Sequence, residues 1–219
     1  MLRLRERWRE RRAERRGAAR DRELLASLQG RRDLRINVGS SSSHLPGWLN
    51  ADLLRDPEEQ CIQMDATQPW PFEPGSAAAV NSEHFIEHIG VDGARRYFRE
   101  AFRVLRPGGV IRTSTPDLEG LARVYLEGDP GLLKLHREHG YEANVHGDLV
   151  NNYFYLWDHR HIFDFPKLAE LLGEAGFESV ERARFGESSH DELRGIDRHD
   201  VGALERTVIA VDAVKPEAR

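Results

Sequence analysis

The sequence predicts an α/β fold in which helices cover both faces of one sheet, and three observations support this. Seven short apolar runs typical of strands recur along residues 34–214. Stretches with the 3.6-residue periodicity of helices lie between the later runs. The order of these elements suits a covered sheet, and 219 residues are enough for one domain with a substantial core.

The stretch 34–53 has the layout of a nucleoside site. Apolar and polar residues alternate over 34–38, as in a strand with one face against a core. This strand runs into Gly39 and the serines 40–43, and a second short strand ends at Asp52. Small residues let the backbone approach a ligand, and a carboxylate after the next strand can accept hydrogen bonds from both ribose hydroxyls. Only Gly39 of the usual glycine triplet is present, so a serine-rich loop without a ligand remains an alternative.

The rest of the chain continues the pattern of strands and helices. Residues 106–109, Arg-Pro-Gly-Gly, are expected to end a helix and turn the chain. Residues 129–164 are the least regular part and are rich in His, Tyr and Trp. The other expected elements are strands at 61–64, 77–80, 110–115, 177–185 and 206–214, and helices at 91–105, 118–127 and 165–176.

Charge is distributed unevenly along the chain. Residues 1–32 hold twelve Arg and five acidic residues, which leaves −12 for the remainder of a chain with net charge −5. An acidic body argues against nucleic acid as the main partner. Residues 1–30 are expected to form a separate, solvated helical arm, and docking of this arm to RNA or an anionic membrane is the alternative.

Cysteine usage and hydropathy bear on the compartment. Cys61 is the single cysteine, so no intramolecular disulfide can form. No apolar run approaches the roughly 20 residues needed to span a membrane. The N-terminus lacks the apolar centre of a signal peptide. These features predict a protein of the reducing cytoplasm.

Four motifs follow one another in an informative order: INVGS…PGWLNADL, MDATQPWPF, NSEHFIEHI and FRVLRPGGVIRTSTPDLEGL. They cover about residues 34–128, and HRHIFDFPKLAELLGEAGF extends the match. In this order they resemble the class I S-adenosylmethionine-dependent methyltransferases, and more narrowly a bacterial, methyltransferase-11-like group. The resemblance implies a Rossmann-like, seven-stranded, mostly parallel sheet with the last strand antiparallel, in one domain over 31–219. It also implies S-adenosyl-L-methionine as cofactor and S-adenosyl-L-homocysteine as product.

The resemblance places the cofactor across the carboxyl ends of the first four strands. Asp52 would bind the ribose hydroxyls, Asp65 would face the adenine amino group, and the Ala66 amide would meet a ring nitrogen. Ser82 and Glu83 would line the methionine end. An acidic site suits a ligand that carries ammonium and sulfonium charges. The implied cofactor residues are Gly39, Ser40, Ser41, Asp52, Asp65, Ala66, Ser82 and Glu83.

Two features depart from the family pattern. Gly39 would pass close to the methionine part of the cofactor, but the usual second glycine is replaced by Ser41, which narrows the space beside the cofactor. In addition, Gly39 and Asp52 are only thirteen residues apart, so the first crossover helix must be a turn or be absent.

Methyl transfer to a hydroxyl benefits from a base, and histidine has a suitable pKa. His88 is the first candidate because the loop after the fourth strand borders the methyl donor in this fold. The further catalytic candidates are His84 and, in the irregular region, His159 and His161. The alternative is that His88 only packs or caps the following helix through Glu87.

Two other groups of residues suggest metals. His84, Glu87 and His88 form an H-x-x-E-H string, which on a helix is the zinc pattern of inverted zincins and would make the protein a zinc hydrolase. A divalent ion is also conceivable at a second cluster. The alternative is that the cluster belongs to a substrate lid over 129–164. His159 and His161 are two residues apart, and the notional metal site needs both rings, which this spacing would point apart. No resident metal is predicted. The residues of this second cluster are His146, Asp158, His159 and His161.

The acceptor is expected to be a small molecule, such as a sugar or a natural-product hydroxyl, modified by O-methylation. Five aromatic side chains between the helix 118–127 and the lid suit a ring-shaped or saccharide acceptor, or are simply core. Members of the family often lie beside polysaccharide genes. A third class, a non-catalytic protein that keeps the fold, also remains open. The five aromatic residues are Tyr125, Tyr141, Tyr153, Tyr155 and Trp157.

Overall fold

The computed structural model describes residues 2–54, 61–198 and 204–217 of the chain. Within these residues the strands are β1 (Leu34–Val38), β2 (Leu49–Asp52), β3 (Cys61–Gln63), β4 (Ala77–Glu83), β5 (Leu105–Pro116), β6 (Glu178–Ala183) and β7 (Val208–Val214). The helices are α1 (Leu2–Ser27), η1 (Ile86–His88), α2 (Gly90–Val104), α3 (Leu118–Glu127), α4 (Pro130–Glu138), α5 (His146–Tyr155), α6 (Phe165–Ala175) and η2 (Asp191–Leu193).

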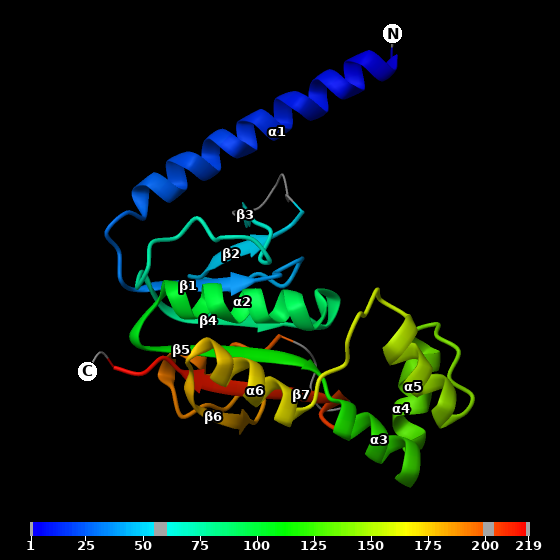
Figure 1. Cartoon of the computed structure of the whole chain (residues 1–219). Helices are drawn as coiled ribbons and strands as arrows, with labels where there is room; N and C mark the ends of the chain where they lie inside the picture. Colours follow the sequence, from blue (N-terminus) through cyan, green and yellow to red (C-terminus); the bar gives the residue numbers. More distant parts are fainter. Residues whose placement is uncertain (1, 55–60, 199–203, 218–219) are drawn as a thin grey trace.

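One seven-stranded sheet with the order β3-β2-β1-β4-β5-β7-β6 forms the centre of the molecule (Figure 1). β7 is antiparallel to both of its neighbours, and the other strand pairs are parallel. No helix separates β1 from β2. The predicted α/β sheet, its antiparallel last strand and the missing first crossover helix are therefore confirmed.

Helices pack on both faces of the sheet. α2 and α6 lie side by side on one face and bury the apolar side of the central strands. The short η2 helix covers the opposite face, where Leu193 and Ile196 pack against Ala79 and Val110. Adjacent residues of one strand thus face different cores, as the two-residue period of a strand requires.

The fifth strand begins earlier than the sequence predicts. α2 ends at Val104, and Leu105 already pairs with Ala77. The register then shifts, so that Ala79 pairs with Val110. The Arg106–Gly109 segment is therefore a bulged entry into β5 rather than a separate turn, and Gly108 takes a positive φ of 72° within it.

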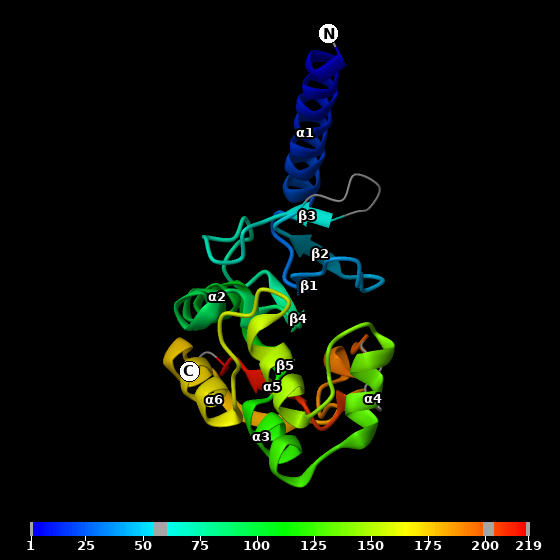
Figure 2. The same cartoon turned by 90° about the vertical axis from the view of Figure 1, so that its right-hand side faces the viewer.

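The expectation that residues 129–164 are irregular is wrong. The segment contains α4 and α5, which gather with α3 beyond the carboxyl end of the sheet (Figures 1 and 2). Asp129 caps α4 by accepting a hydrogen bond from the Leu132 amide at 2.9 Å, and Pro130 follows at the first helical position. These helices have a core of their own, made of Leu121, Val124, Leu132, Leu133, Ala143, Leu149, Tyr153 and Ile162.

α1 extends away from the sheet, and its last turns are anchored beside β3 (Figure 1). Arg20 donates a hydrogen bond to the Cys61 carbonyl at 3.0 Å. Leu24 and Leu25 pack against the main core, and Leu28 belongs to it. Cys61 itself is buried at the start of β3. In the described part of the chain, no helix combines the length and apolar character needed to cross a membrane.

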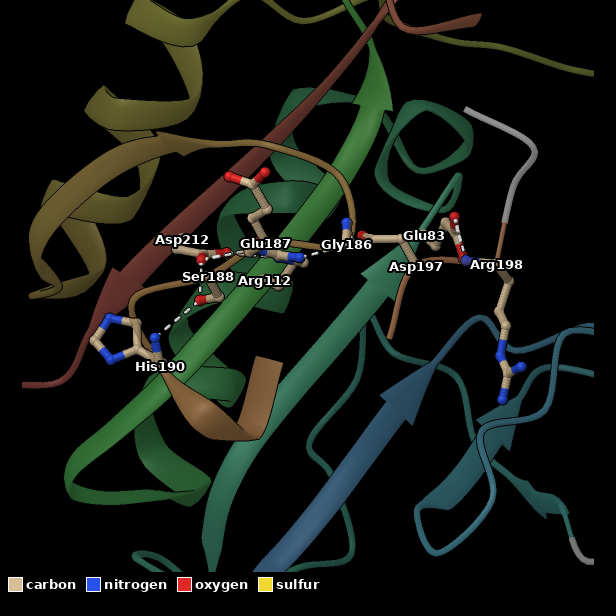
Figure 3. Close-up of polar contacts among 9 residues, drawn as sticks. All are labelled: Glu83, Arg112, Gly186, Glu187, Ser188, His190, Asp197, Arg198 and Asp212. Carbon is tan, nitrogen blue, oxygen red and sulfur yellow. Dashed lines mark hydrogen bonds and ion pairs between the residues drawn. The ribbon is translucent and has the colours of Figure 1, made fainter. Parts of the chain in front are cut away.

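A buried arginine joins the middle of the sheet to the segment that covers it (Figure 3). Arg112 on β5 is fully buried and donates two hydrogen bonds to Asp212 on β7, at 2.7 and 2.9 Å. It also bonds Asp197 at 2.8 Å and the Glu187 carbonyl at 2.6 Å. Burial alone would lower the pKa of Arg112, but the two carboxylates outweigh it and raise the pKa. The guanidinium therefore stays charged and makes four hydrogen bonds.

Gly39 makes the turn after β1 with a φ of +68°, and Phe85 lies directly against it. A Cβ atom added at Gly39 would come within 2.8 Å of the Phe85 Cβ and 2.4 Å of its ring. Gly47 also has a positive φ, but a Cβ there would meet open space. The two glycines share the backbone requirement and differ in the space around them.

Replacement of Arg112 by Ala is expected to lower the free energy of unfolding by about 3–5 kcal/mol, because Asp212 and Asp197 lose their buried counter-charge. Urea denaturation measures the change. Arg123→Ala is the control, since its ion pair with Glu119 is exposed and contributes little. Equal denaturation midpoints for the two variants would contradict the structural role of Arg112.

Gly39→Ala is expected to be more destabilising than Gly47→Ala. Both variants incur about 1–2 kcal/mol for a left-handed non-glycine residue. Only the first also displaces a packed side chain, which typically adds about 1–3 kcal/mol. Thermal unfolding of the two variants side by side isolates the steric part, and a Gly39→Ala loss no larger than the Gly47→Ala loss would refute it.

Candidate active site

The carboxyl ends of β3, β2, β1 and β4 form one edge, because these strands are adjacent and parallel. Every residue that the sequence assigns to the cofactor lies at or just beyond this edge. β1 leads to Gly39, Ser40 and Ser41, β2 ends at Asp52, β3 leads to Asp65 and Ala66, and β4 ends with Ser82 and Glu83.

Asp52 is half-buried and held in place by two backbone amides. Its Oδ2 accepts a hydrogen bond from the Ser41 amide at 2.9 Å, and its Oδ1 accepts one from the Leu54 amide at 2.9 Å. Each carboxylate oxygen has a second lone pair. The oriented carboxylate can therefore still accept hydrogen bonds from a pair of hydroxyls.

Ser41 stands where the family pattern has a glycine, and its backbone takes the left-handed conformation that glycine favours, with a φ of 41°. The hydrogen bond from its backbone amide to the Asp52 carboxylate offsets part of the strain. The loop thus keeps the shape of a glycine turn. Together, the turn at Gly39 and the anchored carboxylate fit a nucleoside with a methionine tail.

The remaining predicted cofactor residues differ in accessibility. Asp65 is exposed and accepts hydrogen bonds from the amide and hydroxyl of Thr67. Ser82 is fully buried and its hydroxyl lies 3.2 Å from that of Thr113, so its side chain is closed off from the edge. Glu83 is half-buried and accepts two hydrogen bonds from the Arg198 amide, both of 3.1 Å (Figure 3).

Residues 84–88, hereafter the histidine–glutamate loop, connect this edge to a cavity. Phe85 in the loop packs on Gly39, while three other members of the loop line the cavity. His84 has a φ of +49°, and the helix η1 begins only at Ile86. The premise that His84 and His88 share one face of an α-helix is therefore wrong, and with it the inverted-zincin geometry.

The carboxylate of Glu87 is fully buried in the centre of this loop. Its Oε1 lies 3.1 Å from His84 Nδ1, and its Oε2 accepts a hydrogen bond from the Thr115 hydroxyl at 3.0 Å. Burial alone would raise the pKa of Glu87, but the hydrogen bond and charge interaction with His84 outweigh it, and the pKa lies below its usual value. The group is therefore ionised at neutral pH, and His84 Nδ1 is the donor.

The backbone of Glu87 also holds the segment that follows α5. Its carbonyl accepts hydrogen bonds from the amides of Arg160 and His161, at 2.8 and 3.2 Å. This pairing brings His159 next to His88, with 5.0 Å between ring centroids. Burial lowers the pKa of His159, so its ring is neutral at neutral pH.

The cavity has a volume of about 400 Å³, which is in the range of small-molecule sites. One side is the histidine–glutamate loop. Another part of the lining is an aromatic wall, defined as Tyr141, Tyr153 and Trp157. Trp157 donates a hydrogen bond to the Tyr141 hydroxyl at 2.9 Å, and their rings meet edge to face. The residues that line the cavity are His84, Glu87, His88, Pro116, Leu135, His136, His139, Tyr141, Tyr153, Trp157, His159 and Leu204.

The structure brings together three of the four predicted catalytic histidines. His84 and His88 line the cavity, but His161 packs against Phe163 and lines a separate small cavity. His159, the other candidate base of the irregular region, lines the cavity instead. His136 was not foreseen, because nothing in the sequence places α4 over the site.

The second cluster, which the sequence offers only as an alternative metal site, does not assemble. His146 accepts a hydrogen bond from the Asp129 amide at 2.6 Å, and His161 faces Phe163. Of the aromatic candidates, Tyr125 and Tyr155 are exposed, and the other three form the aromatic wall. Among the described residues, the metal-ligating atoms that do come together are those of Glu87, His88 and His159.

Comparison with known proteins supports the assignment of the fold. The chain is 16% identical to a possible exported protein from Bordetella parapertussis (TM-score 0.52, covering 90% of this chain and 67% of that chain). It is 15% identical to a SAM-dependent methyltransferase from Archaeoglobus fulgidus (TM-score 0.50, covering 93% and 94%). Identities this low show the fold. No curated protein sequence matches the chain.

A further solved structure contains the cofactor's product. It is Haemonchus contortus phosphoethanolamine N-methyltransferase 2 in complex with phosphomonomethylethanolamine and S-adenosylhomocysteine, with 14% identity and a TM-score of 0.46. The match covers 91% of this chain and 53% of that chain, so the chain spans about half the length of that enzyme.

The sequence profile of the family described as "Methyltransferase domain" matches residues 46–113, from the loop before β2 into β5. This range includes the anchored carboxylate of Asp52 and the whole histidine–glutamate loop. The strand order is that of methyltransferases that use S-adenosylmethionine. The chain therefore has the fold of the class I S-adenosylmethionine-dependent methyltransferases, and residues 46–113 match the methyltransferase-domain family.

Proposed function

We propose that this methyltransferase transfers a methyl group to a hydroxyl of a small, ring-shaped acceptor bound in the cavity between the histidine–glutamate loop and the aromatic wall. One observation carries the proposal. A single loop touches the cofactor edge through Phe85 and the cavity through His84, Glu87 and His88. An acceptor in the cavity would thus lie next to the methyl donor.

The cofactor would lie along the carboxyl edge of the four parallel strands. Asp52 would accept the ribose hydroxyls, and Asp65, the exposed carboxylate after β3, would face the adenine. The turn Gly39–Ser41 and Glu83 would border the methionine part. Ala66 and Ser82 would contribute through their backbone, since Ser82 has its hydroxyl turned inward toward Thr113. When bound, the sulfonium supplies the methyl group, and its sulfur keeps the bonding electron pair as the new carbon–oxygen bond forms.

A residue of the histidine–glutamate loop removes the proton from the acceptor hydroxyl. His88 is half-buried at the cavity and stands beside the ionised Glu87. An imidazole there can take the hydroxyl proton as the methyl group transfers, and the nearby carboxylate stabilises the imidazolium that results. His84 is tied to Glu87 through Nδ1, so it orients the carboxylate rather than meeting the acceptor.

The cavity favours an acceptor with a ring and hydroxyl groups. The aromatic wall offers flat apolar surface to a sugar or phenol ring. His136 also lines the cavity, and its Nδ1 is buried without a hydrogen-bond partner in the described part of the chain. A hydroxyl of the acceptor would satisfy it. Modification of a polysaccharide or natural product in a bacterial cytoplasm is consistent with this chemistry and with the single, buried cysteine.

Asp52→Asn is expected to weaken S-adenosylhomocysteine binding by about 10–100-fold, because hydrogen bonds to a charged acceptor contribute about 1.5–3 kcal/mol. Isothermal titration calorimetry measures the affinity. Asp33→Asn is the matched control, since Asp33 precedes the amino end of β1 and pairs only with Arg31 among the described contacts. If the Asp52 variant bound as tightly as the control, the cofactor placement would be wrong.

His88→Ala is expected to lower the methyl-transfer rate by about 10²–10⁴-fold through loss of the base, with S-adenosylhomocysteine affinity unchanged. The assay follows S-adenosylhomocysteine release with a panel of phenols and p-nitrophenyl glycosides as acceptors. His190→Ala is the control, because His190 lies on the segment after β6, away from the cavity (Figure 3). An unchanged rate in the His88 variant would leave the loop without a proton acceptor and refute O-methylation by this route.

A further inference from the structure

Three side chains at the floor of the cavity form a compact set of metal-ligating groups. One oxygen of Glu87 and one nitrogen each of His88 and His159 all lie within 4.8 Å of one another. Glu87 is fully buried, and the two histidines are half-buried. A fully buried carboxylate beside two imidazoles is unlike the exposed acidic clusters that are common on protein surfaces.

The three groups are oriented by bonds from outside the set. His159 Nδ1 lies 2.6 Å from the Tyr153 carbonyl, which can only accept, so Nδ1 carries the proton and Nε2 keeps the lone pair. Thr115 and His84 each hold one oxygen of Glu87. Such outer bonds fix the tautomer of a ligating histidine and orient a ligating carboxylate.

The set comes from two distant parts of the sequence. Glu87 and His88 follow β4, and His159 follows α5, but the Glu87 carbonyl ties the two segments together. A zinc ion with ligand bonds of about 2.1 Å needs ligand atoms about 3.4 Å apart in a tetrahedron. Because the present spacing is at most 4.8 Å, rotation of the half-buried rings would have to bring the ligand atoms closer by up to about 1.4 Å.

We propose that Glu87, His88 and His159 bind one divalent transition-metal ion, of the kind that imidazole and carboxylate ligands prefer, with Zn²⁺ as the representative. Two histidines and one carboxylate leave at least one position open toward the cavity. An acceptor hydroxyl in that position would lose its proton to water more easily, because a bound cation stabilises the alkoxide. When the ion is bound, His88 is one of its ligands and is no longer a free base. The ion then promotes loss of the hydroxyl proton in place of His88.

The test uses the full chain, stripped with a chelator and titrated with ZnCl₂ by calorimetry, with bound zinc counted by mass spectrometry. Wild-type protein is expected to bind one zinc ion per chain. His159→Ala is expected to weaken binding by at least about 100-fold, and Thr115→Val, which removes only the hydroxyl on Glu87, by about 10–100-fold. His161→Ala is the matched control, because this histidine lies two residues away and faces Phe163.

Two results would overturn the site: sub-stoichiometric zinc in the wild type, or equal binding by the His159 and His161 variants. Because Glu87→Gln alters a buried group and can unfold the protein, the half-exposed His159 is the decisive position. Co²⁺ in place of zinc gives a visible spectrum that reports the histidine and carboxylate ligands directly. Zinc binding and methyl transfer are measured separately. Methyl transfer without any zinc binding would refute the metal site and leave the proposed function standing. Zinc binding without methyl transfer would support the metal site and count against the proposed function.

Discussion

The buried carboxylate of Glu87 is the interaction on which the site depends. Glu87 lies just after β4 and joins two distant parts of the chain to this point. Its carboxylate binds Thr115 at the end of β5, and its backbone carbonyl binds the segment after α5. A buried carboxylate without partners would be strongly unfavourable. The hydrogen bonds of the Glu87 side chain and backbone therefore hold these three segments in one arrangement, and the cavity forms between them.

The cavity is built from a structural unit that the sheet alone does not require. α3, α4 and α5 share their own small core at the carboxyl end of the sheet. After α5, Trp157 and Asp158 both take left-handed backbone conformations, with φ values of 58° and 57°. Strain of this kind in non-glycine residues persists where surrounding contacts fix it and is common at functional sites. Here it turns Trp157 back against Tyr141 and His159.

The buried cluster around Arg112 stabilises a different region of the molecule. It ties β5 to β7 and, through Asp197, to the segment that covers the second face of the sheet. The same segment includes Arg198, whose amide donates to Glu83 at the end of β4. A buried ion pair adds little net stability compared with apolar packing, but it disfavours alternative arrangements strongly. We infer that its value lies in fixing the position of that covering segment.

Local patterns were sufficient to predict the strands, the helices α2, α3 and α6, and the cofactor edge. Strand periodicity and the residues at strand ends are local properties, and parallel strands necessarily bring their carboxyl ends to one edge. The places where local reasoning failed have physical causes. α4 and α5 bury their leucines together with His136 and Tyr153 through contacts between helices that a local pattern does not record. β5 begins with a bulge that contains the Pro-Gly-Gly segment.

The catalytic side of the site shows the same division. The sequence by itself determined that the proposed cofactor residues gather at one edge of the sheet, because the carboxyl ends of parallel strands meet there. Only the tertiary structure decided which histidines share the cavity. His161 and His159 are two residues apart, yet the bonds of the Glu87 carbonyl to residues 160 and 161 turn one toward His88 and the other toward Phe163. That choice depends on contacts across more than seventy residues of chain, which no local pattern records.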